Sequence, residues 1–468
     1  MAAFPVRAFI RWLLIGFLLV GAGAFAAAAW QLPPMLRIGS AYVAKTVCSG
    51  MYVSGLDFDR VWDEDVLGRQ NPLLNLFRVT VDDPVRRITA SPFGLGAFSN
   101  TAVHREGLGC ALAIGITPAE LAAERAATAG SLADPNAAWP DGSQVSGETP
   151  AVLSAAIDKA FQEPSGDNAG NLRTRAVVIV RDGQIVAERY AEGITETTPL
   201  TGWSMAKPVT AALAGIAMTD SDLALDLDHL LPQWNSDADP RSRIPFSALL
   251  SMTDGLAYNE NYGTVTDTTT MLYDSGNAVD FLAAMDLEDD PGTRWAYSSG
   301  ATVLAMGAMR ASLPVASWLD FPRRALFDPI GMRTAVFETD PSGTFMGSSW
   351  VHASARDWAR FGLLLLEKGL WNGEQVLPVG WVDTMMEPVA ASGGRFTVGN
   401  LWPQRGGSLP SDTLWMRGHD GQSVAIVPSL DLVVVRLGMT NPQGLYDREG
   451  LLADVIAALP EGGPASAD

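Results

Sequence analysis

Between residues 76 and 113, apolar and polar positions alternate over several short runs. The runs "LFRVTVD", "RRITAS", "TAVHRE" and "GCALAIG" have the length and composition of short strands, and Asp-Pro or Gly breakers separate them. Alternation over four to eight residues between such breakers is typical of half-buried strands. The pattern therefore predicts a small strand-rich unit, which we extend over residues 31–129.

The stretch after these strands changes character twice. An Ala-rich piece from Pro118 to Ala129 favours a helix, whereas residues 130–150 are polar and rich in Pro, Gly and Ser. We interpret residues 130–150 as a linker. The main domain is then expected over residues 151–460, with a disordered tail at 461–468.

Alternation returns at both ends of this main domain. Residues 176–190 alternate around Asp182-Gly183, a strong signal for a two-residue hairpin turn, and a second hairpin is predicted with its turn at 428–430. Between the hairpins the apolar spacing is helical, at 208–218, 301–310 and 355–369. The predicted fold class is α+β: an antiparallel sheet built from both ends of the domain, flanked by helices, with an inserted and mostly helical region. A site is expected in the cleft between these two parts.

The N-terminus carries a long apolar segment. Arg7 and Arg11 precede an uncharged stretch from Trp12 to Trp30, whose 19 residues are enough to span a bilayer. The basic flank predicts residues 1–11 in the cytoplasm and a single-pass anchor in the inner membrane, with the main domain on the periplasmic side. A cleaved signal peptide is the alternative, because "AFAAAA" offers small-residue cleavage sites. Both interpretations place the main domain outside the cytoplasm.

The composition excludes some partners. A formal net charge of −20 repels phosphate backbones, so nucleic acid is not expected as a partner. The two cysteines, Cys48 and Cys110, form one disulfide in an oxidising compartment or remain two buried thiols. They and the four scattered histidines show no metal-ligand spacing, so we expect neither a metal nor a cofactor.

A serine and a lysine stand three positions apart at the front of an apolar helical run. Only four of the 32 basic residues are lysines, and one of them, Lys207, follows Ser204 at this spacing. The two side chains then share a helix face, and the helix start favours negative charge developing beside Ser204. A neutral amine can remove the serine proton, which an Arg cannot do. The alternative is a helix-capping Ser204 and a solvated Lys207.

Two later motifs offer partners for this pair. Tyr297 precedes Ser298 and a predicted helix, and it is either a proton carrier beside Lys207 or a residue that packs on the helix. Further on, "GHDGQ" interrupts a predicted strand at residues 418–422. Its Gln422 N–H would join the Ser204 N–H in an oxyanion hole, whereas the alternative is an ordinary turn with a solvated histidine.

Together these motifs resemble a known family. Ser204-Met205-Ala206-Lys207, Tyr297-Ser298-Ser299 and His419-Asp420-Gly421 are similar in order and separation to the signature elements of the serine beta-lactamase and DD-peptidase superfamily. The similarity is greatest to its class C-like branch, which includes esterases and 6-aminohexanoate-dimer hydrolases. It covers about residues 170–440.

The resemblance implies an acyl-enzyme mechanism, in which Ser204 attacks a carbonyl and Lys207 and Tyr297 carry protons. It also implies a substrate-binding role for His419, Gly421 and Ser299, and for Tyr258, Asn259 and Tyr262 in the loop similar to the family's substrate-covering segment. Ser299 and His419 replace the Asn and Lys that are usual in the antibiotic-related members. These departures favour a small-molecule ester or linear amide as substrate rather than a beta-lactam.

Three other functions remain open at this point. A beta-lactamase or DD-peptidase proper would use the same motifs, and a non-catalytic receptor would be acylated without turnover. An α/β-hydrolase is suggested by Gly202-Trp203-Ser204-Met205-Ala206, which nearly matches the GxSxG elbow. That elbow must follow a buried strand, and the preceding "ITETTPLTG" has little apolar content.

Overall fold

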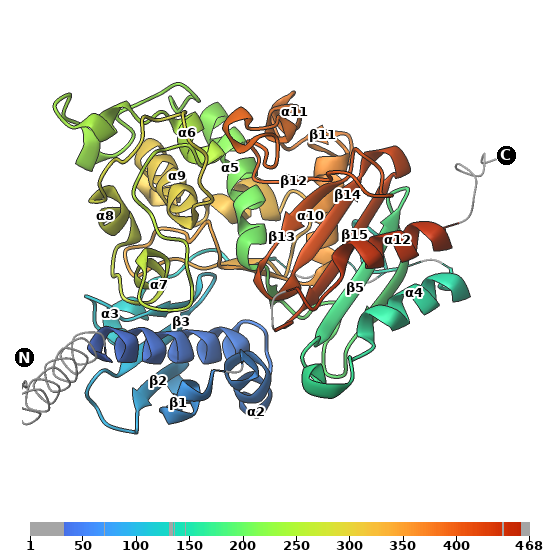
Figure 1. Ribbon diagram of the computed structural model, residues 1–468, viewed down its shortest axis with the longest axis horizontal. Helices are drawn as coiled ribbons and strands as arrows, with labels where there is room; N and C mark the ends of the chain where they lie inside the picture. Colours follow the sequence, from blue (N-terminus) through green and yellow to red (C-terminus); the bar gives the residue numbers. More distant parts are fainter. Residues whose placement is uncertain are drawn as a thin grey trace, which may run out of the picture.

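The computed structural model describes residues 32–69, 71–130, 134, 136–145, 147–441 and 444–459. Figure 1 shows an N-terminal unit in blue and cyan, a mostly helical part in green and yellow, and a sheet in which early and late segments of the chain lie side by side. The predicted anchor at 12–30 and the predicted tail at 461–468 lie outside the described residues. Among the helices that are described, none has both the length and the apolar character needed to cross a bilayer.

The N-terminal unit combines a long helix with a four-stranded antiparallel sheet. The helix spans residues 32–52, and the strands pair in the order β1-β2-β3-β4. The elements of this unit are α2 (Phe58–Arg60), β1 (Phe77–Asp82), β2 (Arg87–Pro92), β3 (Asn100–Arg105), β4 (Gly109–Leu112) and α3 (Pro118–Leu121). A disulfide between Cys48 on the helix and Cys110 on β4 joins the helix to the sheet. The four strands confirm the alternation seen in the sequence, whereas the helix over 32–52 was not predicted.

The main sheet has six antiparallel strands in the order β12-β13-β14-β15-β5-β6, so both ends of the domain build it, as predicted. Its strands are β5 (Thr174–Arg181), β6 (Gln184–Tyr190), β12 (Trp402–Pro403), β13 (Leu414–Arg417), β14 (Ser423–Val427) and β15 (Leu432–Gly438). Helices α4 (Ala151–Phe161) and α12 (Arg448–Ala458) pack together on one face, and α10 (Ala355–Leu366) covers the other. Because both faces are covered, seven of the eight residues of β5 are buried.

The inserted region is mostly helical, as predicted, with two small sheets. Its central helix α5 is buried along most of its length and packs against α9 and α11. The elements are β7 (Leu200–Thr201), α5 (Ala206–Asp220), α6 (Phe246–Ser251), α7 (Asp267–Tyr273), α8 (Ala278–Ala283), α9 (Ser299–Ser312), β8 (Val336–Phe337), β9 (Val351–Ala353), β10 (Leu370–Trp371), β11 (Glu374–Gln375) and α11 (Trp381–Met386).

Both predicted hairpins are confirmed. Strands β5 and β6 turn at Asp182-Gly183, where both residues have positive φ angles of 50° and 73°, the conformation of a type I′ turn. Strands β14 and β15 turn through Pro428–Leu430. The three predicted helices in between correspond to α5, α9 and α10.

One prediction about the segment before the main domain was wrong. The helix expected from Pro118 to Ala129 ends at Leu121, because later backbone N–H groups find other acceptors, such as Ala126 N–H on the Glu106 carbonyl. The predicted linker at 130–150 stays a prediction, and in the part of it that is described some side chains pack on the main domain. Its Trp139 is buried, and Arg360 on α10 lies over the ring at 4.4 Å.

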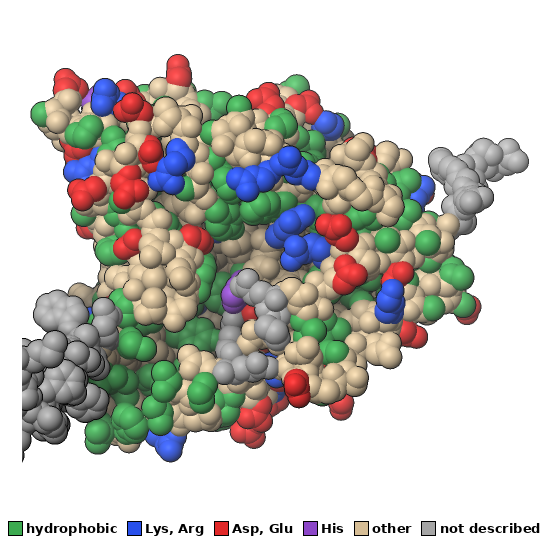
Figure 2. Space-filling view, viewed as in Figure 1, with side chains coloured by type: hydrophobic (Ala, Val, Ile, Leu, Met, Phe, Trp, Pro, Cys, Tyr) green, Lys and Arg blue, Asp and Glu red, His purple; other side chains and the backbone are tan. Residues whose placement is uncertain are grey.

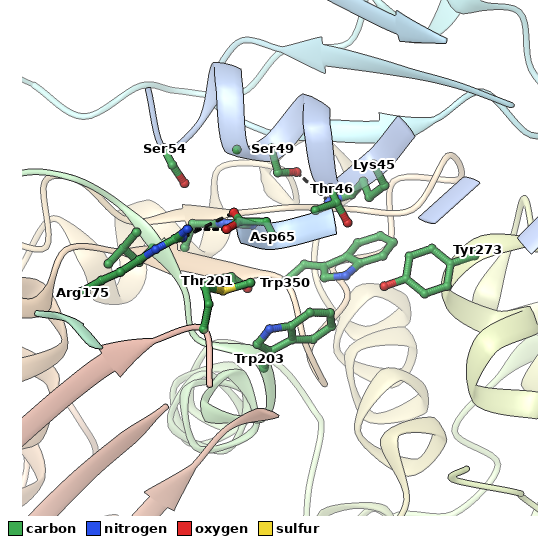
Figure 3. Close-up of a pocket in the computed structure, with 14 residues that line it drawn as sticks. Lys45, Thr46, Ser49, Ser54, Asp65, Arg175, Thr201, Trp203, Tyr273 and Trp350 are labelled. Atoms are coloured by element: carbon green, nitrogen blue, oxygen red, sulfur yellow. Dashed lines mark hydrogen bonds and ion pairs between the residues drawn. The ribbon is translucent and has the colours of Figure 1, made fainter. Parts of the chain in front are cut away.

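A buried charged cluster joins the N-terminal unit to the main domain. The fully buried carboxylate of Glu338 accepts hydrogen bonds from the Lys45 amine, the Ser49 hydroxyl, the Cys110 N–H and His352 Nε2. Four donors compensate the cost of removing this charge from water. Figure 3 shows Lys45 and Ser49 on the long helix facing Trp203 and Trp350 across a small cavity of about 50 Å³.

Candidate active site

The segment that carries Ser204 runs from a short strand into a helix. Strand β7 pairs with β9, the turn η6 (Trp203–Met205) follows, and α5 begins at Ala206. Ser204 therefore lies two residues before the start of α5 rather than in its first turn. Trp203 has a φ of +48°, which is strained for a non-glycine residue and fixes the direction of the turn.

Lys207 connects Ser204 to the core of the main domain. Its side chain is 1% exposed, and its Nζ lies 3.1 Å from each of three oxygens: Ser204 Oγ, Ser299 Oγ and the Ser348 carbonyl. A protonated amine has three N–H donors, so all three are satisfied in this arrangement. The amine is therefore held in one position next to the serine hydroxyl, and the alternative of a solvated Lys207 is wrong.

Glu260 extends this network, and the sequence analysis did not identify it. Its carboxylate accepts hydrogen bonds from the Ser299 N–H and the Ser299 hydroxyl, both at 2.7 Å. The hydroxyl in turn accepts from Lys207, so Glu260, Ser299, Lys207 and Ser204 form one chain of contacts. No signal in the sequence marks Glu260, which is one acidic residue among 52 and lies in a loop next to a residue that was predicted, Asn259.

Tyr297 lies beside the lysine through its ring. Lys207 Nζ is 4.9 Å from the ring centroid, and Phe396 and Trp402 contact other sides of the ring. The aromatic neighbours fix the ring plane, and the cation lies within cation–π range of its face. The hydroxyl makes no hydrogen bond to a described residue.

The predicted "HDG" motif forms a tight turn, η12 (His419–Gly421), between β13 and β14. Arg436, which is fully buried, holds this turn by donating to the carbonyls of Asp420 and Gly421 at 3.2 and 3.1 Å. Burial lowers the pKa of Arg436 to about 10, which leaves it charged at neutral pH. A side chain at Gly421 would meet Arg436 at 2.7 Å, and the φ of +79° also favours glycine there.

His419 is held between two aromatic side chains. The Trp203 ring meets it edge-on at 5.5 Å, and the Tyr262 ring stacks on it at 5.7 Å. Its Nε2 lies 3.4 Å from the Asp420 carboxylate. Tyr262 also donates to Glu260 at 3.3 Å, which connects the turn to the lysine network.

These groups open into one cavity of about 360 Å³ between the helical part and the sheet. Figure 2 shows the molecule hollowed in this central region, with Lys and Arg side chains in blue beside the hollow. Of the predicted residues, the lining includes Ser204, Tyr297, His419, Gly421 and Tyr262. The size matches that of a small-molecule site.

Besides the buried Lys207, four other predicted residues do not line the cavity. Tyr258 packs against Gly300 and directs its hydroxyl to Met271 at 3.8 Å, so it is a half-buried residue that packs on the core. Asn259 is exposed and organises its own loop through hydrogen bonds with Asn261 and Thr268. Ser299 is fully buried behind the cavity, where it contacts Lys207 instead of solvent.

The fourth is Gln422, the predicted oxyanion donor. Its side chain is buried against Gly438, and its backbone N–H donates to the His419 carbonyl at 3.4 Å within the turn. The N–H is thus already engaged, although the contact is long. The Ser204 N–H remains the candidate donor at the cavity.

The arrangement supports nucleophilic chemistry by Ser204 with the Lys207 amine as proton acceptor. An α/β-hydrolase is excluded, because the strand before Ser204 has two residues and the main sheet is entirely antiparallel.

The comparisons with known proteins agree with this fold. The model of a family described as Beta-lactamase matches residues 153–458, which is more than half of the chain. No curated protein is significantly similar to the chain in sequence.

Three solved structures show the likeness in fold. A provisionally assigned 6-aminohexanoate-dimer hydrolase from Bacillus anthracis aligns with a TM-score of 0.52 and 22% identity, over 65% of this chain and 80% of its own. A family VIII carboxylesterase aligns with a TM-score of 0.52 and 12% identity, over 68% and 99% of the two chains. A penicillin-binding protein homologue from Caulobacter crescentus aligns with a TM-score of 0.51 and 15% identity, over 68% and 100%.

Proposed function

The chain belongs to the beta-lactamase family, and from this premise we propose that it is a serine hydrolase that cleaves esters or small linear amides through an acyl-enzyme. The observation that supports this most directly is the contact between a buried amine and a serine hydroxyl at the cavity, with 3.1 Å between Lys207 Nζ and Ser204 Oγ. The short separation is the geometry that general-base activation of a nucleophile requires.

In the proposed first step Lys207 acts as a neutral amine. Two N–H groups keep their bonds to Ser299 Oγ and the Ser348 carbonyl, and the lone pair faces Ser204 Oγ. The serine oxygen attacks the substrate carbonyl while its proton passes to Lys207. The tetrahedral intermediate expels the leaving group, which takes up that proton, directly or through the Tyr297 hydroxyl. Water then attacks the acyl-enzyme by the same route in reverse and restores Ser204.

Glu260 is a positioning residue in this scheme. By accepting both the N–H and the hydroxyl of Ser299, it fixes the oxygen on which Lys207 depends for its orientation. Tyr262, whose hydroxyl donates to Glu260, stacks on His419 in the same cavity. A rigid supporting shell of this kind keeps a nucleophile and base within the narrow range of productive geometry.

The direct test uses a serine-directed fluorophosphonate probe. We expect the probe to label Ser204, and Ser204→Ala to abolish both labelling and hydrolysis of a short-chain p-nitrophenyl ester. Labelling that survives in Ser204→Ala would exclude this serine as the nucleophile. A non-catalytic receptor is distinguished by its kinetics, because it would release one equivalent of p-nitrophenol and then stop.

His419 is the basis for preferring esters and linear amides over beta-lactams. An imidazole lies here between two aromatic rings, in place of the fixed ammonium group that a lysine would present. The names of two structural neighbours, a 6-aminohexanoate-dimer hydrolase and a carboxylesterase, agree with this preference. We expect wild type to favour a p-nitrophenyl ester over a cephalosporin in kcat/KM, and His419→Lys to shift this ratio toward the cephalosporin. A wild-type preference for the cephalosporin would instead indicate a beta-lactamase proper.

We also propose that the domain works on the periplasmic side of the inner membrane, attached through residues 12–30. The disulfide between Cys48 and Cys110 supports an oxidising compartment. A C-terminal reporter that is active only outside the cytoplasm should be active in this context. Activity of a cytoplasm-specific reporter would contradict the topology.

A further inference from the structure

A lysine of the N-terminal unit reaches into the part of the molecule that carries the nucleophile. Lys45, on the helix over residues 32–52, is 3% exposed, and its amine donates to the Glu338 carboxylate. The same amine lies over the Trp350 ring, 4.1 Å from the ring centroid. The chain has only four lysines, and Lys45 and Lys207 are the two that are buried. The proposed mechanism uses Lys207 and leaves Lys45 without a role.

Glu338 and Trp350 belong to one hairpin, which consists of β8, β9 and the loop between them and which we call the β8–β9 hairpin. The two residues are paired across its base, because the Glu338 N–H donates to the Trp350 carbonyl at 2.9 Å. The Glu338 carboxylate is fully buried and also accepts from the Cys110 N–H at 2.7 Å. Lys45 therefore contacts both sides of the hairpin at its base.

The loop of this hairpin provides an acceptor to the proposed base. The Ser348 carbonyl accepts from Lys207 Nζ at 3.1 Å. The neighbouring Gly347 carbonyl accepts from the Thr210 hydroxyl of α5 at 3.0 Å. The loop is thus attached to α5 at two carbonyls, and one of them orients the amine that faces Ser204.

The strand at the end of the hairpin supports the nucleophile. β9 pairs with β7, and the Gly202 N–H donates to the Val351 carbonyl at 2.8 Å. Gly202 is the second residue before Ser204, and Trp203 between them has the positive φ that fixes the turn. A displacement of β9 therefore moves the backbone from which Ser204 projects.

A second route leads from Glu338 to the same turn through a side chain. His352 on β9 contacts the Glu338 carboxylate through Nε2 at 3.1 Å, and its backbone pairs with Thr201 on β7. The small cavity of about 50 Å³ is lined by Lys45, His352, Thr201 and Trp203, so the lysine faces the residue that precedes the nucleophile (Figure 3). Both routes connect the Lys45 contact to the segment that carries Ser204.

We propose that Lys45 is a positioning residue for the hydrolase reaction, because it fixes the hairpin on which Ser204 and Lys207 both depend. The inference rests on the proposed function, since positioning matters only if this pair reacts. Lys45 does not line the cavity that contains Ser204, so it acts through the Glu338 carboxylate and the hairpin backbone. The two backbone carbonyls of the hairpin that contact Lys207 and Gly202 are the end points of this chain of contacts.

The N-terminal unit thereby has a part in catalysis although it lies outside the family domain. The matched family region begins at residue 153, so it includes Glu338 and excludes Lys45. A buried ion pair contributes little net stability, because the desolvation of both charges offsets much of their attraction. Such a pair can instead specify one arrangement of the elements that it joins, which here are the N-terminal helix and the β8–β9 hairpin.

The experiment compares two buried ion pairs that join the same two units. Lys45→Met removes the amine at Glu338 and keeps a similar side-chain length. The matched control is Arg175→Met on β5. Arg175 is 4% exposed, and within the described part of the chain its guanidinium donates only to Glu64 and Asp65 of the N-terminal unit. The control thus loosens the contact between the units without removing a hydrogen bond from the β8–β9 hairpin.

Two further variants separate positioning from folding. Lys45→Arg keeps the cation, and the adjacent cavity of about 50 Å³ gives room for the larger guanidinium. The double variant Lys45→Met, Glu338→Gln leaves no unpaired charge at this place, so it decides the question if Lys45→Met alone does not fold. Each variant is the full chain, assayed well below its own melting temperature with a p-nitrophenyl ester and with the fluorophosphonate probe.

We expect Lys45→Met and the double variant to lower kcat and the rate of labelling of Ser204 about ten- to a hundredfold, because a small displacement of a base from its nucleophile slows a reaction by this order. KM should stay within threefold of wild type, since the cavity lining is unchanged. Lys45→Arg should recover most of the rate. Arg175→Met should keep kcat within threefold of wild type even though it lowers the melting temperature.

A wild-type kcat in folded Lys45→Met, or in the double variant, would overturn the positioning role. So would an equal loss of kcat in Arg175→Met, because the effect would then come from a general loosening of the two units. A folded Lys45→Arg protein as slow as Lys45→Met would also contradict it. Absence of both hydrolysis and labelling in wild type would instead contradict the proposed function.

Discussion

Replacement of Lys207 by arginine tests the proposed mechanism most sharply, because it keeps the positive charge and removes the titratable amine. The amine is 1% exposed and makes three hydrogen bonds of 3.1 Å. A guanidinium can still donate to Ser299 Oγ and the Ser348 carbonyl, so these contacts and the fold should largely persist. What it cannot do is accept the Ser204 proton, since it stays charged at any accessible pH.

The size of the effect follows from general-base catalysis, which contributes about 10²- to 10⁴-fold. At 1.36 kcal/mol for each factor of ten, this is roughly 3 to 5 kcal/mol of transition-state stabilisation. We expect Lys207→Arg to lower kcat/KM for a p-nitrophenyl ester by that factor, and to slow fluorophosphonate labelling of Ser204 in proportion. Raising the pH to 9 should not restore the rate.

Arginine is larger than lysine, so a fold control is required. Lys207→Met keeps a similar length without any donor, and circular dichroism melting curves identify variants that have lost stability instead of chemistry. A folded Lys207→Arg protein that works within about threefold of wild type would refute the assignment. Lys207 would then be an electrostatic or structural residue.

The remaining predictions concern the network, the domain interface and the disulfide. Glu260→Gln should lower kcat about ten- to a hundredfold with little change in KM, because a charged acceptor of two 2.7 Å hydrogen bonds is lost; unchanged kcat would remove its positioning role. Burial lowers the pKa of His352 to about 4, so unfolding takes up a proton between pH 6.5 and 4 and the free energy of unfolding falls as the pH drops through that window, by roughly 3 kcal/mol. His352→Gln should flatten this part of the pH–stability curve measured by urea titration, and an unaltered slope would contradict the assignment. Opening the disulfide, which joins residues 62 apart, should cost about 4 kcal/mol on the loop-entropy estimate. Melting curves of a Cys48→Ser, Cys110→Ser double variant that match wild type would refute this.

The sequence determined those features whose physical cause lies within a few neighbouring residues. The Asp182-Gly183 turn has two residues that tolerate positive φ between alternating strands, so the hairpin follows from local conformation alone. Ser204 and Lys207 are three residues apart at a helix start, and this spacing by itself brings them onto one face. Helices α5, α9 and α10 and the hairpin of β14 and β15 follow from apolar periodicity in the same way.

The tertiary structure decided which side chains from distant segments meet. Lys207 contacts Ser299, which is 92 residues away, and Ser299 contacts Glu260 across a further 39. The spacing of apolar and polar residues within one segment does not predict such contacts. They depend on how α5, α9 and the loop that carries Glu260 pack together. The same holds for Tyr258, which resembled a cavity residue in sequence but directs its hydroxyl to Met271 in the core.

The cavity itself is also a product of packing alone. Arg417 and Arg448 lie 31 positions apart in separate elements, and nothing in the residues around either one indicates that they face the same space as Ser204. Trp139, in the predicted linker, is a second example of a contact that the sequence does not reveal. It is buried, and the residue that lies over its ring is Arg360 of α10, more than two hundred residues later. Periodicity is a property of one segment, whereas a site and an interface arise only when the segments are assembled, because burial and pairing are fixed by the whole fold.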